Sequence, residues 1–307
     1  MTTIAPFFQN SKHDIPQAVI FLSGSGSNAE KILEKWRNAG SDREYNIAAL
    51  FTDSPAKSRA RELAQQFDVP YIENDIRAFY KNKGLDSLSI AHEAGQKARR
   101  EWTDSIREQL APYKPDFGIL AGFARLCNIT EDFPCLNIHP GDLTYIKDGK
   151  RYLTGLHTIP VEKAILEGLD HLRSSVIIAQ KFSSGGKGMD SGPILGISQA
   201  VHVDLRGTNI EELRRCQSQR PEKKPKGGYE DKLEQVAEEN LEKLKKQGDW
   251  VVFPQTVQDF ASGKFAVDDA DSLWYRGNGK WLPIQTVVYR EQDKEVLFRN
   301  SQPSETL

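Results

Sequence analysis

Three polar side chains of this sequence could together carry out acyl transfer. Asn137 and His139 lie in the segment Leu-Asn-Ile-His-Pro (136–140), and Asp190 begins the segment Asp-Ser-Gly-Pro (190–193). An amide can polarise a carbonyl, an imidazole can move a proton, and a carboxylate can set the charge of the imidazole. These residue types predict an enzyme that transfers an acyl group.

The geometry of a β-strand would bring the amide and the imidazole together. Successive side chains of a strand point to opposite faces, so Asn137 and His139 should share one face. Pro140 has no N–H and is expected to end the strand. Both side chains would then lie at the carboxyl end of a strand, where open α/β sheets bind ligands. The alternative is an exposed strand end without a function, and the acidic, glycine-flanked segment favours the enzyme.

A glycine-rich turn near the start of the chain predicts a phosphate site. The apolar run 18–22 is typical of a buried strand, and Ser-Gly-Ser-Gly-Ser-Asn (23–28) follows it directly before an amphipathic helix. Free N–H groups and the helix dipole both point at such a turn. Gly24-x-Gly26-x-x-Ala29 also matches a dinucleotide fingerprint, with Asp53 as a ribose-binding acid. A NAD-dependent oxidoreductase is therefore a second hypothesis, and a tight turn without a ligand is a third.

Strands and helices alternate along most of the chain. This order predicts an α/β fold, a doubly wound, mostly parallel twisted sheet with helices on both faces. The sequence Gly-Asn-Gly (277–279) predicts a hairpin near the end, followed by further short strands. The chain should therefore end in a small C-terminal β appendage.

Composition shifts divide the chain into regions. We expect an N-terminal leader at 1–16, a catalytic domain at 17–263 and the C-terminal β-hairpin appendage at 264–307. Residues 206–228 are polar, basic and rich in proline and glycine, which predicts a flexible basic insertion within the catalytic domain.

The overall composition is that of an ordinary soluble protein. Of the 307 residues, 38% are hydrophobic and 27% charged, with a net charge of −2, so neither nucleic acid nor an anionic membrane is expected as a partner. The three cysteines have no metal-ligand spacing, and we expect no metal. The N-terminal residues lack a signal-peptide pattern, and no apolar run is long enough for a membrane helix. We expect a cytoplasmic protein.

Five motifs follow one another along the chain, at residues 23–28, 120–123, 136–140, 155–158 and 190–193. Together they resemble the folate-dependent formyltransferases, most closely those that act on glycinamide ribonucleotide. The resemblance extends over about residues 17–200 and implies transfer of a formyl group from 10-formyltetrahydrofolate to the amine of a phosphorylated acceptor in purine synthesis. The folate would be a co-substrate, and a homodimer is a possible assembly.

The resemblance also implies roles for single residues. The formyl carbonyl would face the catalytic residues Asn137 and His139, with Asp190 beside the imidazole. The phosphate of the acceptor would be held by Gly26, Ser27 and Asn28. The folate would contact five further residues, namely Leu120, Phe123, Arg125, Leu126 and Met189.

Some residues differ from the pattern of the family. Gly141 and Asp142 stand where Ser and Leu are usual, Ala124 replaces Met, and Ile177 replaces His. These positions are expected near the acceptor or the folate, so another amine, or water as in a formyltetrahydrofolate hydrolase, is an alternative acceptor. Outside the family, a non-catalytic binding protein that uses residues 206–228 as its contact surface is a further alternative.

Overall fold

The computed structural model describes residues 3–7, 13–123, 125–180, 189–225 and 227–299. Ala124 and the loop before Asp190 lie outside the described residues. The chain divides into two compact units. The first comprises Met1–Ile138, Ile177–Pro193 and Thr256–Pro283, and the second comprises His139–Val176, Ile194–Gln255 and Ile284–Leu307.

A five-stranded parallel arrangement forms the centre of the first unit. Its hydrogen-bonded order is β6-β5-β2-β3-β4, and every pair in it is parallel. The apolar residues of these strands are buried on both faces, as expected for strands covered by helices on each side. The strands are β2 (Gln17–Phe21), β3 (Asn46–Thr52), β4 (Tyr71–Glu73), β5 (Phe117–Leu120) and β6 (Cys135–His139).

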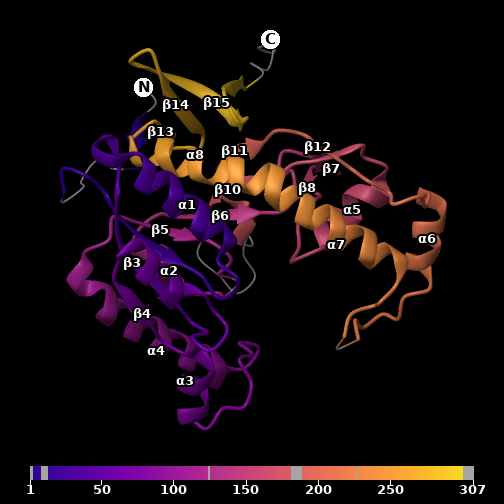
Figure 1. The fold of residues 1–307 in the computed structure, drawn as a ribbon, viewed down its shortest axis with the longest axis horizontal. Helices are drawn as coiled ribbons and strands as arrows, with labels where there is room; N and C mark the ends of the chain where they lie inside the picture. Colours follow the sequence, from indigo (N-terminus) through magenta and orange to yellow (C-terminus); the bar gives the residue numbers. More distant parts are fainter. Residues whose placement is uncertain (1–2, 8–12, 124, 181–188, 226, 300–307) are drawn as a thin grey trace, which may run out of the picture. The chain divides into compact units, whose positions relative to one another are not determined.

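Helices cover both faces of these strands (Figure 1). Trp102 of α4 and Tyr80 of α3 share a core cluster with Phe21 and Phe51, whose side chains point to one face. Leu63 of α2 lies close to Leu22, on the opposite face. The helices are α1 (Ser27–Asn38), α2 (Ala60–Phe67), α3 (Ile76–Asn82) and α4 (Glu93–Leu110), with the 3₁₀ turns η1 (Gly40–Asp42), η2 (Ala111–Tyr113) and η3 (Asn128–Glu131).

Antiparallel strands from the two ends of the chain form a separate group within the first unit. β1 (Ile4–Pro6) pairs with β13 (Phe265–Asp268), which pairs with β14 (Leu273–Gly277). A hairpin then leads from β14 into β15 (Lys280–Tyr289). Asn278 and Gly279 in its turn have positive φ values of 49° and 77°, as a type I′ turn requires. The expected hairpin around Gly-Asn-Gly is therefore confirmed.

The second unit is built around three helices that share one hydrophobic core. Leu213 of α6 and Leu233 of α7 are both fully buried in this cluster, against Val161 of α5. β11 pairs in parallel with the end of β15, and β15 pairs with β16. The remaining elements of the chain are β7 (Ile146–Lys147), β8 (Lys150–Arg151), α5 (Ile159–Glu167), β9 (His171–Leu172), β10 (Ser175–Ile178), η4 (Met189–Ser191), β11 (Ile194–Ser198), β12 (Val201–His202), α6 (Ile210–Ser218), α7 (Lys232–Leu244), the π-helical turn η5 (Lys245–Asp249), α8 (Trp250–Ala261) and β16 (Lys294–Phe298).

These elements confirm the predicted fold class, a mixed, mostly parallel sheet with helices on both faces and a C-terminal group of β-strands. Part of the expected basic insertion has regular structure, because residues 210–218 form α6 with Asn209 as its N-cap. The flexibility of residues 206–228 stays a prediction. Among the described helices, none has the length and apolar character needed to cross a membrane.

Candidate active site

Asn137 lies in the first unit, in the strand at the end of the parallel arrangement. It is paired in register with Leu120 of β5 and is half-buried, and β10 lies on the other side of β6. The preceding residues Cys135 and Leu136 are fully buried and fix the strand against its neighbours. The amide is therefore held by a packed strand.

His139 is the last residue of β6 and belongs to the second unit. It is only 3% exposed, and its Nε2 lies 2.7 Å from the carbonyl oxygen of Leu153. A carbonyl oxygen can only accept a hydrogen bond, so Nε2 must carry the hydrogen. As predicted, Asn137 and His139 lie on one strand, and that strand ends before Pro140.

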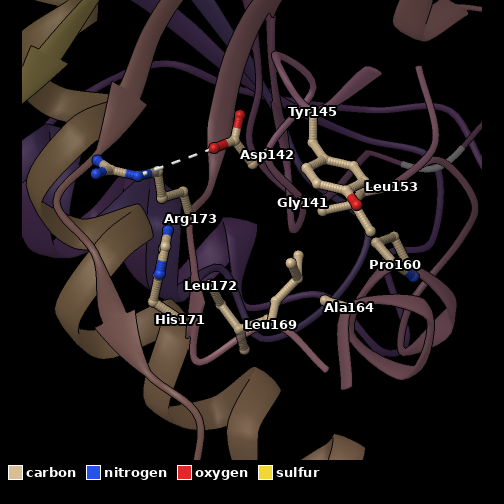
Figure 2. A pocket seen from close by; sticks show the side chains of 10 residues that line it. All are labelled: Gly141, Asp142, Tyr145, Leu153, Pro160, Ala164, Leu169, His171, Leu172 and Arg173. Atoms are coloured by element: carbon tan, nitrogen blue, oxygen red, sulfur yellow. Dashed lines mark ion pairs between the residues drawn. The ribbon is translucent and has the colours of Figure 1, made fainter. Parts of the chain in front are cut away.

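A cavity of about 170 Å³ lies in the second unit (Figure 2). Leu153 and Gly141, which both lie close to the imidazole, form part of its wall. Nε of Arg173 lies 3.8 Å from Oδ2 of Asp142 across one side of the cavity. The rest of the wall is mostly apolar and includes Tyr145, Pro160, Ala164, Leu169, His171 and Leu172.

Asp190 lies in the short turn η4 of the first unit and is half-buried. Gly192 packs so closely on the end of β10 that an added Cβ would lie 1.9 Å from the carbonyl oxygen of Ile178. The N–H of Ala179, the next residue, donates to Cys135 at 2.8 Å. Glycine is thus required for this segment to pack on β10, and β10 in turn lies next to β6, the strand that carries Asn137.

Two of the predicted folate residues are buried, whereas Arg125 is partly exposed. Leu120 and Phe123 belong to the core, where Phe123 stacks on Trp102 with ring centroids 6.5 Å apart. Arg125 is about one-third exposed, and its Nε donates to Oδ2 of the buried Asp53 at 3.1 Å. Leu126 and Met189 are also placed in the first unit, and the contacts of all five residues with folate stay predictions.

The glycine-rich turn has the predicted strand–turn–helix form. Gly26 has a φ of 67° and precedes the first residue of α1, Ser27. An added Cβ at Gly26 would lie 2.8 Å from Leu63, so glycine is required for packing as well as for conformation. Arg59 lies beside the turn and donates to the carbonyl oxygen of Ser25 at 3.3 Å. Phosphate binding by Gly26, Ser27 and Asn28 stays a prediction.

Two contacts of the site region were not predicted. Asp53, interpreted as a ribose-binding acid, is instead buried against Arg125. Lys163 donates to the carbonyl oxygens on both sides of Leu153, the partner of His139. Neither contact joins residues close enough in sequence to produce a recognisable spacing.

A family model described as formyl transferase matches residues 17–222. The chain belongs to the formyl transferase family. It is a formyltransferase, and members of this family use formyltetrahydrofolate as co-substrate. The hypotheses of a NAD-dependent oxidoreductase and of a non-catalytic binding protein are therefore wrong.

Solved structures of other formyltransferases share the fold. Glycinamide ribonucleotide transformylase 1 from Symbiobacterium toebii is 22% identical with a TM-score of 0.52, over 83% of this chain and 92% of that one. Phosphoribosylglycinamide formyltransferase from Anaplasma phagocytophilum is 18% identical with a TM-score of 0.53, over 90% and 99%. The enzyme of the same name from Coxiella burnetii is 18% identical with a TM-score of 0.53, over 88% of this chain and 96% of that one. No curated protein sequence matches this formyltransferase.

Proposed function

We propose that this formyltransferase transfers the formyl group of 10-formyltetrahydrofolate to the amine of a phosphorylated acceptor, glycinamide ribonucleotide. The observation that carries the acceptor class is the strand–turn–helix at Gly26. There Gly26, in the left-handed conformation, directly precedes α1, so the positive end of the helix dipole lies at the turn. The names of the similar solved structures support glycinamide ribonucleotide within that class.

The chemical step begins with attack of the neutral amine nitrogen on the formyl carbon. A tetrahedral intermediate forms, and the former carbonyl oxygen becomes an oxyanion. The amide of Asn137 can donate to that oxygen, and one such donor typically lowers the barrier by about 3 kcal/mol. Because Asn137 is held in a packed strand, its position needs little reorganisation during the reaction.

Collapse of the intermediate breaks the bond between the formyl carbon and N10 of the folate. The attacking nitrogen loses one proton and N10 gains one, so the products are the formylated amine and tetrahydrofolate. His139 and Asp190 supply the acid and base for this transfer, through a water where the distance requires it. The acidic, half-buried position of Asp190 suits this role.

Arg125 offers a cation to the anionic part of the folate. Its Nε is held by Asp53, so the two terminal nitrogens of the guanidinium can bind a carboxylate. This arrangement fits a co-substrate that carries carboxylates.

The direct test mixes the protein with 10-formyltetrahydrofolate and glycinamide ribonucleotide and follows tetrahydrofolate spectrophotometrically. We expect release that depends on the amine. Release of tetrahydrofolate without any amine would identify a hydrolase. Release only with another phosphorylated amine would show that this amine, and not glycinamide ribonucleotide, is the acceptor. No release with any phosphorylated amine would contradict the proposal.

Substitution at the helix N-terminus tests the phosphate site separately. Ser27→Asp places a carboxylate where the phosphate should bind and should raise the KM for the acceptor about tenfold, which corresponds to roughly 1.4 kcal/mol. Ser27→Asn is the neutral control and should change the KM much less. Equal KM values for the two variants would contradict phosphate binding at this turn.

A further inference from the structure

A three-residue turn presents the carbonyl group that contacts His139. The N–H of Thr154 donates to the oxygen of Tyr152 at 2.9 Å, which closes a γ-turn around Leu153. Leu153 is only 2% exposed, because its side chain belongs to the core of the second unit. Its carbonyl oxygen accepts the 2.7 Å hydrogen bond from His139.

Lys163 of α5 holds both ends of this turn. Its Nζ donates to the oxygen of Tyr152 at 3.1 Å and to that of Thr154 at 2.8 Å. Burial lowers the pKa of the Lys163 ammonium. Within the described part of the chain, no carboxylate forms an ion pair with this ammonium, so its contacts with the turn are its main polar contacts.

Gly141 makes room for the contact between the carbonyl group and the imidazole. A Cβ at this position would lie 2.5 Å from the oxygen of Leu153 and 3.0 Å from Nε2 of His139. Any larger residue would displace the carbonyl or the ring. The glycine that distinguishes this chain from the usual pattern of the family therefore belongs to the same arrangement.

We propose that Lys163 is a positioning residue that fixes the γ-turn at Leu153, so that Nδ1 of His139 is the nitrogen that gains and loses a proton. The inference rests on the proposed catalytic role of His139. Because Nε2–H is committed to a carbonyl, the neutral ring presents a lone pair at Nδ1, and the charged ring presents Nδ1–H. Random exchange between the two tautomers would leave part of the enzyme with the wrong nitrogen protonated.

The tautomer can be measured directly by ¹⁵N NMR of the free protein. Protonated and unprotonated ring nitrogens have well-separated shifts, and His139→Gln assigns the signal among the six histidines. For neutral His139 we expect hydrogen on Nε2 in the wild-type protein and in Lys163→Arg, which keeps the donors. In Lys163→Met we expect a mixture of tautomers.

A matched control separates this role from packing around Tyr152. Nζ of Lys163 lies 5.5 Å from the centroid of the Tyr152 ring. Nζ of Lys147 lies over the same ring at 4.7 Å but donates to Glu167. Lys147→Met should leave the His139 signals and turnover unchanged. Lys163→Met should lower kcat by up to ~10²-fold, since small misplacements of catalytic groups cost this much, while the folate KM stays within a few-fold.

The outcomes distinguish this inference from the proposed function. Hydrogen on Nδ1 of neutral wild-type His139, or identical His139 signals in wild type and Lys163→Met, would overturn the positioning role even in an active enzyme. A tautomer shift in a protein that transfers no formyl group would retain the positioning role and contradict the function. If Lys163→Met does not fold, the wild-type tautomer and Gly141→Ala, which should displace the carbonyl, test the same claim.

Discussion

At the scale of single residues, Asp53 and Arg125 form a pair that joins two loops at the ends of β3 and β5. Asp53 is fully buried, and its Oδ1 has no hydrogen-bond partner among the described residues. Its other oxygen accepts from Nε of Arg125. The buried carboxylate thus fixes the direction of a guanidinium that we assign to the folate.

Asp53→Asn should weaken folate binding without affecting the chemical step. The amide keeps the shape but removes the charge that orients Arg125, and we expect the folate KM to rise about tenfold with kcat within a few-fold. Steady-state kinetics measure both. The control is Asp132→Asn at the exposed pair with Arg107, which should leave KM unchanged. An unaltered KM in Asp53→Asn would contradict the role of Arg125.

His139→Ala and Asp190→Asn should lower kcat and leave folate binding nearly unchanged. Each removes a group that we propose to move protons in the transition state, so kcat should fall by roughly 10²- to 10⁴-fold. Folate affinity, measured by fluorescence titration, should stay within a few-fold because in our proposal other residues bind the folate. Parallel losses of affinity and rate would show that these side chains bind folate rather than act in catalysis.

The sequence placed Asn137 and His139 on one strand, which the structure confirms, whereas its grouping of Asp190 with them stays a prediction. Alternation in one strand is enough to place Asn137 and His139 on a common face. Lys163 could not be identified, because its role depends on a turn whose carbonyl groups carry no sequence signal. The same holds for the contact between Asp53 and Arg125.

At the scale of elements, Arg220 connects two helices of the second unit. Its guanidinium donates to Glu162 of α5 and to Asp231, the N-cap of α7, each at 2.6 Å. Its side chain is only 10% exposed. The hydrogen bond from Arg220 lowers the pKa of Asp231 below its ordinary value of 3.8.

Arg220→Met should destabilise the protein by about 3 kcal/mol, because it leaves two largely buried carboxylates without their partner. Urea denaturation measures this loss, and Arg214→Met at an exposed pair on α6 should cost less than about 1 kcal/mol.

The contribution of Asp231 to the free energy of unfolding is present above pH 3.8 and is lost as the pH falls through the lower pKa of the folded state. The difference between wild type and Arg220→Met should therefore shrink below about pH 4, and a constant difference would contradict this assignment.

Most elements were predictable because their hydrophobic patterns are strong. The buried strands and the amphipathic α7 follow directly from periodicity. Helix α6 was missed because the proline- and glycine-rich residues after it dominated the interpretation. The signal was nevertheless present, since Asn209 and Glu212 have the spacing of a helix N-cap and its N3 acid.

At the scale of the whole molecule, the C-terminal strands extend beyond the residues that match the family model. β15 begins in the hairpin with β14 and ends in parallel pairing with β11 of the second unit. Val287 and Tyr289 at that end are fully buried. The parallel pairing could not be predicted from sequence, because nothing local specifies which distant strand β15 meets.

Removal of residues 284–307 should therefore destabilise the folded protein. The shortened chain would expose the edge of β11 and lose the buried side chains of β15, so we expect aggregation and a lower midpoint of thermal unfolding. Size-exclusion chromatography and calorimetry measure both. A chain ending at residue 299 keeps every described strand and should behave as wild type. A monomeric, equally stable protein ending at residue 283 would contradict this view.

The stacking of Trp102 on Phe123 gives the enzyme an internal optical probe. The indole Nε1–H is bound to Asn74 and the ring is wholly shielded from solvent, so its emission should report on its neighbours alone. If folate binding moves the Phe123 ring, the emission of Trp102 should change. Replacing the other four tryptophans with phenylalanine would yield a protein whose fluorescence follows folate binding in real time.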